Sequence, residues 1–509
     1  MSSSQSRPPT QALGLLCDAF GDPYSLSTLR GAIERMIRAG FHVVSFCGGF
    51  PQAPLFSGPG GAARIPEVVD GLIMLSATLR SPEPELCRLA ASVAGPVVSV
   101  GDHLPGFANV GVNDEAAVFQ SVAHLVKRHD CQRIAYIAGP EGSVDGERRL
   151  AAYRLALEHF GLQPDPGLLA RGNFEASSGR EAAMRLCAGG SRRFDAIVAA
   201  NDLMAIGAIE ALTSAGIGVP EAVKVVGFDG IDESPFACGG LTTVGQPVTE
   251  QGATAAELLM RLLAGETVEL SPTLISAALL IRHTCGCGSV ADTWQKQAAS
   301  APSAQVPRAE LALLDGAFRE TIRRQLATKR LQRELARLAA LLLGVRDYRE
   351  LALGLTDVVR LFDMRRFVLC TYAADPRLAR VLLESSGRDV LFRSQAEALP
   401  IELVLRAVLA KRGNPTSLFV EPLEIADEHF GFLIIEGDLS YGVAQLELRY
   451  LVAAALSRIA MMGEMRRLYS AGRRIEKSSP AASEPVRSER SSPSSAPGEL
   501  PGAPTVTKP

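Results

Sequence analysis

Short apolar runs alternate with helical patterns from residue 11 to about residue 230. The first four runs are apolar enough to be strands that are buried on both faces. Eight such runs are visible: Leu13–Asp18, His42–Gly48, Val69–Leu75, Pro96–Asp102, Arg133–Pro140, Leu168–Phe174, Phe194–Asp202 and Val223–Asp229. Helical patterns, such as those at 115–128, 149–160 and 203–215, separate them. This alternation predicts an α/β fold with parallel sheets, and two groups of four strands predict two lobes.

Several of these expected strands end in a polar or small residue just where a loop begins. The residues are Asp18, Gly48, Asp102, Asp202 and Asp229. In open α/β sheets, ligands bind beyond the carboxyl ends of the strands, where backbone groups and helix N-termini face the ligand. We therefore expect a cleft between the lobes. Asp202 is equally well placed to cap the helix that begins at Leu203.

Length, charge and cysteine usage limit the class of protein. A chain of 509 residues is too long for one core, and one domain per ~150 residues predicts several units. The net charge of −3 supplies no global basic field for nucleic acid or an anionic membrane. Residues 1–10 are polar, contain no secretory signal and are expected to be disordered. No uncharged apolar run of ~18 residues occurs, and scattered cysteines indicate reduced thiols, so a cytoplasmic protein without membrane contact is expected.

The strand pattern ends after Gly288. Residues 286–308 are polar and contain Ala, Ser, Gln and Pro, which indicates a linker. Residues 309–343 carry leucines at three- and four-residue spacing, which predicts a long signalling helix that forms a coiled coil or packs on the next domain.

A mixed pattern over residues 345–438 predicts a smaller α+β domain. Its expected elements are helices at 349–362 and 401–411, a strand at 367–372, and a hairpin with strands at 417–423 and 429–436. An exit helix is expected over residues 440–476, with heptad positions at Leu448, Val452, Ala455, Ile459, Met462 and Tyr469. Residues 477–509 are rich in Ser, Pro, Ala and Glu, which predicts a disordered tail.

Two stretches carry a family resemblance: Val69-Asp70-Gly71-Leu72-Ile73, and a longer one from Ala200-Asn201-Asp202-Leu203-Met204 through Val225-Val226-Gly227-Phe228-Asp229 to Gln246-Pro247. Through them, residues 11–285 resemble the effector-binding core of the LacI/GalR regulators, itself similar to periplasmic sugar-binding proteins. The resemblance implies a two-lobed, periplasmic-binding-protein-like type I fold with chain crossings near Val112, Val244 and Ser271. Lobe 1 would comprise about 11–112 and 245–270, and lobe 2 about 113–244 and 271–285.

The resemblance also implies ligand contacts at particular residues. Asp229 would accept hydrogen bonds from ligand hydroxyls, Asn201 would contact the ligand, and Arg149 would donate to it unless Arg148 takes that role. The full expected set is Asp18, Phe20, Tyr24, Asp102, Arg149, Phe174, Asn201, Asp229, Phe236 and Gln246. Many family members carry an acidic residue where Gly101 stands, so the effector class stays open between a sugar, a nucleoside and a similar metabolite.

The repressors of this family place a helix-turn-helix and a hinge helix before the first strand of the core. Only about ten residues precede that strand in this sequence. A helix-turn-helix needs two helices and a turn, so direct binding to DNA by the usual route is not expected.

Residues 345–438 resemble a GAF-type sensor domain, chiefly in Phe419–Leu423 and Gly431–Ile435. Cores of the LacI type joined to such a domain also occur in bacterial signalling proteins that end in a diguanylate cyclase or a histidine kinase. The stretch Arg282–Cys287 looks like the end of the core in those fusions. Neither a Gly-Gly-Asp/Glu-Glu-Phe sequence nor a kinase ATP-binding pattern follows Tyr469.

No pattern in the chain points to catalysis or to a cofactor. His283, Cys285 and Cys287 lie within five residues of one another, and no second pair of ligands is identified elsewhere in the sequence, so no metal site is expected. A Gly-Lys-Ser/Thr phosphate loop, a His-Glu-x-x-His helix and a Gly-x-Ser-x-Gly elbow are all missing from the sequence. A non-enzymatic protein is therefore expected.

The sequence favours a ligand-responsive regulator in which a small molecule closes the two lobes and the movement passes through the helix at 309–343 to the GAF-like domain. Its partners would be a second copy of the chain or a separate output protein. One alternative is a LacI-family transcriptional regulator that reaches DNA through a partner or a basic surface such as Arg323, Arg324, Lys329, Arg330 and Arg333. Another is a receptor that lost its output domain and acts as a scaffold.

Overall fold

The computed structural model describes residues 11–18, 23–48, 52–56, 65–79, 81–188, 194–288, 329, 332–361, 364–386, 389–393, 396–410, 414–437 and 442–478. The expected disordered segment at 1–10 lies outside these ranges, as do Phe20, most of the expected linker, and residues 309–328 of the expected signalling helix. The expected tail at 477–509 also lies outside them, except that residues 477–478 are the end of a helix. A helix is described at 332–342.

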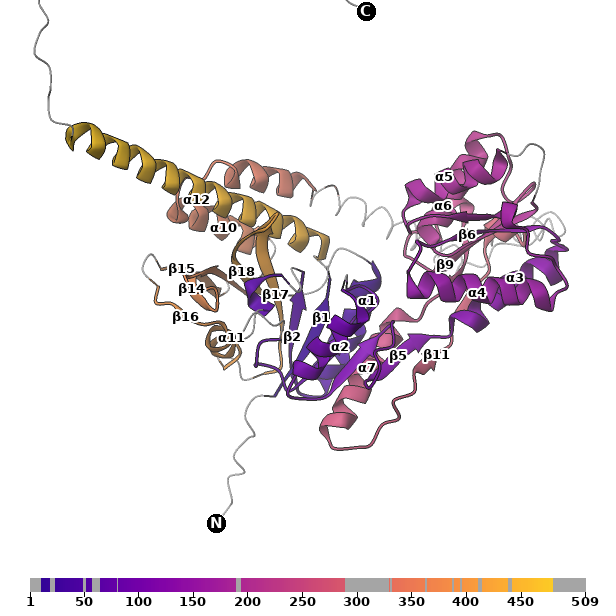
Figure 1. The fold of residues 1–509 in the computed structure, drawn as a ribbon, viewed down its shortest axis with the longest axis horizontal. Helices are drawn as coiled ribbons and strands as arrows, with labels where there is room; N and C mark the ends of the chain where they lie inside the picture. Colours follow the sequence, from indigo (N-terminus) through magenta and orange to yellow (C-terminus); the bar gives the residue numbers. More distant parts are fainter. Residues whose placement is uncertain are drawn as a thin grey trace, which may run out of the picture. The chain divides into compact units, whose positions relative to one another are not determined.

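The first lobe contains a parallel sheet with the strand order β11-β5-β4-β3-β1-β2 (Figure 1). Its strands are β1 (Ala12–Cys17), β2 (His42–Cys47), β3 (Gly71–Met74), β4 (Val97–Val100), β5 (Ala108–Val112) and β11 (Thr273–Ile275). The helices are α1 (Pro23–Arg38), α2 (Glu83–Ser92) and α7 (Val248–Leu263), with a short 3-10 turn at Pro54–Phe56. Strands β1 to β5 are buried along their whole length, as their continuous apolar runs predict.

The second lobe has its own sheet in the order β12-β10-β9-β8-β6-β7, parallel except for β12. Its strands are β6 (Ile134–Ala138), β7 (Leu169–Arg171), β8 (Ala196–Ala199), β9 (Lys224–Asp229), β10 (Thr242–Gly245) and β12 (Ala278–Leu280). The helices are α3 (Asp114–His129), α4 (Val144–His159), α5 (Ala176–Cys187) and α6 (Asp202–Ser214), with 3-10 turns at Pro166–Leu168, Ala237–Gly239 and His283–Cys285. A separate apolar core fills this lobe. The two-lobed α/β prediction is confirmed.

One lobe boundary differs from the expectation. Strand β11 pairs in parallel with β5 of the first lobe, with Leu274 opposite Gly111. The chain therefore crosses for the third time between β11 and β12, at residues 276–277, and not near Ser271. Five exposed or half-buried residues at 271–275 give no apolar signal, so only the backbone pairing assigns them to a lobe.

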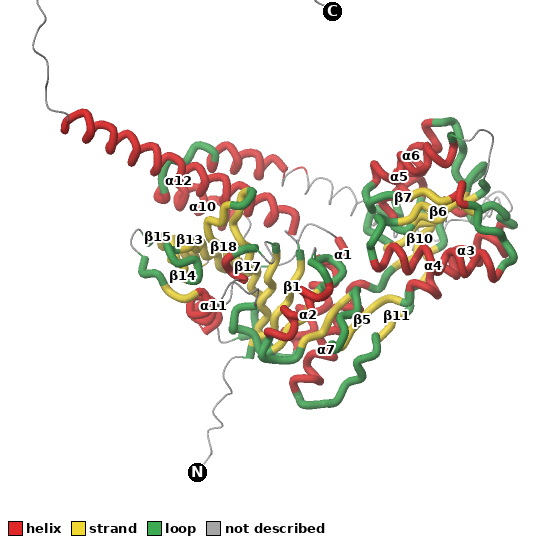
Figure 2. The backbone as a smooth tube through the Cα atoms, viewed as in Figure 1, coloured by secondary structure: helices red, strands yellow, loops and turns green. Residues whose placement is uncertain are grey.

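The C-terminal part of the chain forms an antiparallel sheet in the order β17-β18-β13-β14-β15 (Figure 2). Its elements are α10 (Tyr348–Leu361), β13 (Arg366–Tyr372), β14 (Leu378–Ser386), β15 (Asp389–Phe392), β16 (Leu399–Pro400), α11 (Ile401–Ala410), β17 (Ser417–Ile425), β18 (Glu428–Glu436) and α12 (Gly442–Ser478). The expected hairpin is present as the antiparallel pair β17 and β18. Strands β14 and β15 were not expected: Arg380 and Glu384 interrupt the apolar pattern of β14, and β15 has only four residues.

The sheet of the first lobe continues into this antiparallel sheet. Strand β17 pairs in parallel with β2, with Leu418 opposite Val44, and the Val43 amide donates to the Thr416 carbonyl at 2.9 Å. Apolar side chains from both sheets share a core on each face. An exposed sheet edge carries unpaired backbone groups, and this pairing satisfies those of β2.

The apolar face of α12 is occupied by the chain itself. Leu448, Val452, Ala455 and Ile459 are at most 8% exposed and belong to the core that lies against the sheet. These four heptad positions are therefore covered within the chain and are not free to contact a second copy of the chain or an output protein. A spacing of three and four residues describes a helix packed on a sheet as well as a coiled coil.

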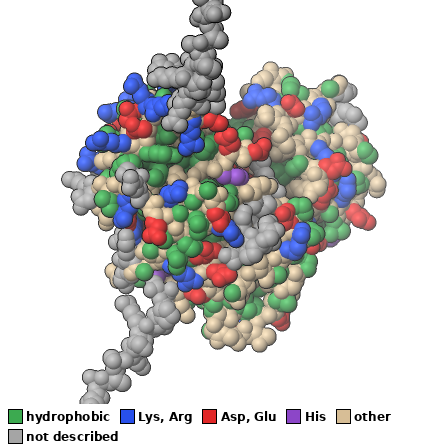
Figure 3. All heavy atoms as spheres, turned by 60° about the vertical axis from the view of Figure 1, so that its left-hand side comes forward, with side chains coloured by type: hydrophobic (Ala, Val, Ile, Leu, Met, Phe, Trp, Pro, Cys, Tyr) green, Lys and Arg blue, Asp and Glu red, His purple; other side chains and the backbone are tan. Residues whose placement is uncertain are grey.

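Charged side chains of both signs are interspersed on the face drawn in Figure 3, as the small net charge leads one to expect. Among the described helices none is long and apolar enough to cross a membrane.

Candidate ligand-binding site

Asp229 ends β9 and lies at the centre of the candidate site. Its backbone has φ of +115°, a conformation that is rare for residues other than glycine. Its carboxylate accepts a hydrogen bond from Gln246 Nε2 at 2.7 Å, and 28% of its side chain is exposed. Burial raises the pKa of Asp229 to about 7, although the neighbouring Arg149 acts in the opposite direction. This carboxylate is therefore poised to change charge near neutral pH.

Arg149 extends from α4 to this carboxylate and is buried. Its Nη1 lies 3.6 Å from Asp229 Oδ1 and donates to the Ala200 carbonyl at 2.9 Å, while its Nε donates to Asp114 Oδ1 at 3.2 Å. The guanidinium also lies 3.9 Å from the centre of the Phe228 ring. Burial lowers the pKa of Arg149, but Asp114 and Asp229 outweigh it and raise the pKa above the usual value. The side chain stays charged and bridges two carboxylates.

The neighbouring Arg148 belongs to the same cluster but is more exposed than Arg149. It is 40% exposed and pairs with Asp145 and, at 3.4 Å, with Asp114 Oδ2. Burial raises the pKa of Asp114, although Arg149 counteracts this. Asp114 is thus a shared acceptor for two arginines, a role that the sequence did not predict. Its position just after β5, at the first residue of α3, is the strand-end signal that could have revealed it.

Asp102 belongs to the first lobe and interacts electrostatically with Asp145, Arg148 and Asp114 of the second lobe. Burial and the charge of Asp145 raise its pKa to about 6, with Arg148 acting in the opposite direction. Among the residues that the structure describes, its buried Oδ1 has no hydrogen-bond partner. A buried carboxylate oxygen without a partner costs free energy, and a ligand hydroxyl would remove that cost.

Asn201 and Asp202 support the site from behind. Asn201 caps α6 by accepting a hydrogen bond from the Met204 amide at 3.0 Å, and its Nδ2 donates to the Phe174 carbonyl at 2.9 Å. Both polar atoms of its side chain therefore make hydrogen bonds within the protein, and the expected ligand contact stays a prediction. Asn201, and not Asp202, is the N-cap of this helix.

Asp202 is fully buried and holds the loop that follows Asp229. Its carboxylate accepts hydrogen bonds from the amides of Gly230 and Ile231 at 2.9 and 3.0 Å. The hydroxyls of Ser234 and Thr243 also donate to it, each at 2.5 Å. Glycine is needed at position 227 because a Cβ there would lie 2.2 Å from the Asp202 carboxylate.

The expected aromatic walls are only partly brought to the site. The Phe174 ring packs over Gly139, where a Cβ would lie 2.4 Å from the ring, and Phe174 has φ of +70°. Phe236 is 59% exposed. Asp18 and Tyr24 are half-buried at the end of β1 and in the first turn of α1.

The cluster offers more hydrogen-bond acceptors than donors. Four carboxylates belong to it, those of Asp102, Asp114, Asp145 and Asp229, against two arginines. Carboxylates accept strongly from hydroxyls, and a buried guanidinium donates strongly to ligand oxygens. This arrangement suits a neutral polyhydroxy compound better than an anion.

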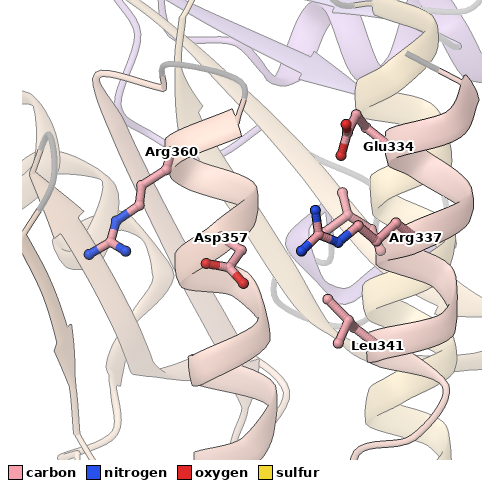
Figure 4. Close-up of a pocket in the computed structure, with 6 residues that line it drawn as sticks. Glu334, Arg337, Leu341, Asp357 and Arg360 are labelled. Atoms are coloured by element: carbon pink, nitrogen blue, oxygen red, sulfur yellow. The ribbon is translucent and has the colours of Figure 1, made fainter. Parts of the chain in front are cut away.

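A hollow of about 300 Å³ lies between the helix at 332–342 and α10 (Figure 4). Arg337 and Asp357 face this groove from its two sides, and both are exposed. Ligand pockets are mostly apolar with few polar anchors, so this charged surface groove is the weaker candidate.

The fold and the cluster together define a bilobed ligand-binding protein. A family model for a periplasmic binding protein-like domain matches residues 122–285. The HTH-type transcriptional regulator CelR of Thermobifida fusca is 30% identical over 270 residues, which cover 52% of this chain and 77% of CelR. The chain therefore belongs to the LacI/GalR family through its effector-binding core.

Other relatives match a shorter part. GalR of Escherichia coli K12 is 30% identical over 211 residues, which cover 41% of this chain and 61% of GalR. Two solved structures are similar to this part of the chain. The structure of the Escherichia coli repressor AscG is 27% identical, and the match covers 54% of this chain and 99% of the AscG chain at a TM-score of 0.44. The structure of the CelR–cellobiose complex is 28% identical, and the match covers 55% of this chain and 86% of the CelR chain at a TM-score of 0.46.

These relatives are regulators of transcription and not enzymes. They favour the transcriptional alternative over the interpretation that the sequence alone favoured, a sensor without a DNA contact.

Proposed function

We propose that this protein is a non-enzymatic regulator of transcription that responds to a neutral polyhydroxy effector, such as a sugar, bound between its lobes. The observation that carries the proposal is the buried Arg149 held between Asp114 and Asp229 at the carboxyl ends of the strands. The accessible edge of Asp229 and the unpartnered oxygen of Asp102 add acceptors for ligand hydroxyls.

Effector binding would act by a shift of population between open and closed lobes. A ligand shifts this equilibrium only as far as it binds one state better than the other. Asp102 belongs to the first lobe, whereas Arg149 and Asp229 belong to the second. A hydroxylated ligand that contacts both groups would bind the closed state better.

Replacing Asp229 by Asn tests the site directly. Hydrogen bonds to charged groups contribute about 1.5–3 kcal/mol, so we expect roughly 10- to 100-fold weaker binding of the effector. Asn tolerates positive φ, so the backbone of the variant should be preserved. Isothermal titration calorimetry of the full chain against a panel of mono- and disaccharides and nucleosides measures the change.

The matched control is Asp130→Asn, because Asp130 is another described aspartate with positive φ and caps the far end of α3. Equal affinities in Asp229→Asn and Asp130→Asn would remove Asp229 from the site. A panel without any binder would remove the sugar proposal altogether.

The affinity for a hydroxylated effector should rise with pH. The carboxylate is the form of Asp229 that accepts hydrogen bonds, and its pKa is about 7. Between pH 6 and pH 8 its ionised fraction grows from about one tenth to about nine tenths, so affinity should increase roughly five- to tenfold. Asp102, with a pKa of about 6, adds a smaller change of the same sign. Titrations at the two pH values would contradict the assignment if the affinity were flat or fell.

The transcriptional role rests on the relatives, which are HTH-type regulators. The experiment is fluorescence anisotropy with a pool of random duplexes, followed by selection, with and without the effector. If the protein contacts phosphates, the logarithm of the binding constant should fall linearly with the logarithm of salt concentration. Salt-independent or absent binding would favour regulation through a partner protein.

The domain formed by residues 345–438 is, in this proposal, a GAF-like module that receives the state of the first lobe. Its five-stranded antiparallel sheet and its direct pairing with β2 support this role. The pairing gives a rigid route from the effector site, in addition to the expected route through residues 309–343.

A homodimer is also proposed, and mass photometry of the full chain with and without effector tests it.

A further inference from the structure

Two histidines and two cysteines from distant parts of the chain meet at the edge of the second lobe. His124 lies in the last turns of α3, and His129 is its final residue. Cys285 ends the 3-10 turn at His283–Cys285, and Cys287 follows two residues later. The four ligand atoms lie within 4.8 Å of one another. From the sequence no second pair of ligands was expected for these cysteines, and that was wrong: the fold brings His124 and His129 next to them.

The distances among His124, His129 and Cys287 match those around a tetrahedral ion, and Cys285 Sγ lies within 4.8 Å of the other three ligand atoms. The two Nε2 atoms of His124 and His129 are 3.3 Å apart, and Cys287 Sγ lies 3.5 and 3.3 Å from them. Zn²⁺ binds imidazole at about 2.0–2.1 Å and thiolate at about 2.3 Å. Tetrahedral angles at these bond lengths separate two nitrogens by about 3.3–3.4 Å and a nitrogen from a sulfur by about 3.5–3.6 Å.

The backbone brings the two thiols to the same point. Gly286, between them, has φ of +93°, which turns the chain so that Cys285 and Cys287 both reach the histidines. A Cβ on Gly286 would lie 3.5 Å from the His129 ring, so the loop packs closely on the end of α3. The two imidazole rings meet edge to face at a centroid distance of 5.0 Å.

A hydrogen-bonded cluster without metal explains this arrangement less well. The Cys285 thiol has an acceptor in the Arg282 carbonyl at 3.4 Å, outside the cluster. The other three atoms converge on one point although a neutral imidazole offers only one donor and one acceptor, and a thiol is a weak donor. Metal binding replaces the thiol protons and satisfies all four atoms at once.

We propose that His124, His129, Cys285 and Cys287 bind one Zn²⁺ ion. Four protein ligands fill the coordination sphere, so the site would be structural and would carry no reaction. It would fasten the end of the effector-binding core to α3, at the point where the chain leaves the second lobe. A change in the second lobe would then move the departing chain with it. This proposal does not depend on the nature of the effector.

Zinc content of the full chain, purified without a polyhistidine tag, tests the proposal. After dialysis against Zn²⁺ and then against metal-free buffer, we expect roughly one zinc ion per chain by elemental mass spectrometry. Loss of a residue that only orients a metal ligand typically weakens metal binding 10- to 100-fold. Because Cys287 would itself be a ligand, Cys287→Ser should weaken zinc binding by more than that. Cys287 is exposed, so this change should leave the fold intact.

The controls are Cys238→Ser, an exposed cysteine outside the cluster, and His103→Gln, an exposed histidine of the first lobe. Both should keep about one ion per chain, whereas His129→Gln should lose it as Cys287→Ser does. Cobalt substitution gives a second measurement: the wild type should show thiolate-to-cobalt absorption and intense tetrahedral d–d bands, and the two ligand variants should not.

Chelation should lower the melting midpoint of the wild type and leave that of Cys287→Ser unchanged, because a metal bound to the native state alone stabilises it. The proposal is overturned if the zinc-dialysed wild type retains no metal, or if Cys287→Ser binds as much zinc as Cys238→Ser. Circular dichroism of each variant separates loss of metal from loss of fold.

Discussion

Replacing Arg149 by Met should lower the free energy of unfolding by about 3–5 kcal/mol and abolish effector binding. Arg149 is 6% exposed and is paired with Asp114 and Asp229. Its removal leaves Asp114, which is 5% exposed, with the more distant Arg148 as its arginine partner. It also removes the ion pair of Asp229 with Arg149. Breaking a buried pair is costly because the remaining charge stays desolvated.

Arg148→Met is the matched control for this change. The two arginines are adjacent, share Asp114 as a partner and would receive the same substitution. Because Arg148 is 40% exposed, its pairs should contribute less than about 1 kcal/mol. Urea unfolding measures both free energies, and calorimetry with the effector measures binding. Similar losses in both variants would show that burial does not distinguish the two arginines.

Replacing Asp202 by Ala should cost about 3–5 kcal/mol of unfolding free energy and loosen the loop at 230–236. The carboxylate is fully buried, and two amides and two hydroxyls donate to it. Alanine would leave these donors buried without an acceptor, each at a cost of about 1–3 kcal/mol before relaxation. Because the loop follows Asp229 directly, effector affinity should fall as well.

Asp195→Ala provides the comparison for Asp202. The Asp195 carboxylate also accepts from two backbone amides, those of Gln132 and Arg133, but in a solvent-accessible turn. Water can replace that acceptor, so we expect a loss of about 1 kcal/mol. Hydrogen exchange followed by mass spectrometry should show faster exchange at 230–236 only in Asp202→Ala. Unchanged exchange in that segment would refute the supporting role of Asp202.

The strand-end rule identified part of the site from the sequence. Asp102 and Asp229 were predicted from their positions at the ends of apolar runs, and both belong to the charged cluster. Asp114 follows the same rule, but the polar segment after β5 gave no reason to single it out. Asn201 was assigned to the ligand because of its motif, whereas its hydrogen bonds are used to cap α6 and hold Phe174.

Contacts between residues that are far apart in the sequence could not be predicted from the spacing of residues along the chain. The histidine pair and the cysteine pair are about 160 residues apart, and each pair alone is an incomplete set of ligands. The pairing of β17 with β2 joins segments that are more than 370 residues apart. Neither meeting leaves a periodic signal in the chain.

The sequence by itself determined the α/β class, eight strands of the two lobes, the hairpin at β17 and β18, and the acidic residues at the strand ends, but not β5, β10, β11 or β12. These features depend on periodicity and turn chemistry, which act over a few residues. The tertiary structure alone decided the lobe that holds β11, the burial of the α12 face, the burial of Arg149 beside the exposed Arg148, and the Cys–His cluster. Each of these depends on which distant atoms come within hydrogen-bonding or coordination distance, and that is settled only when the whole chain packs.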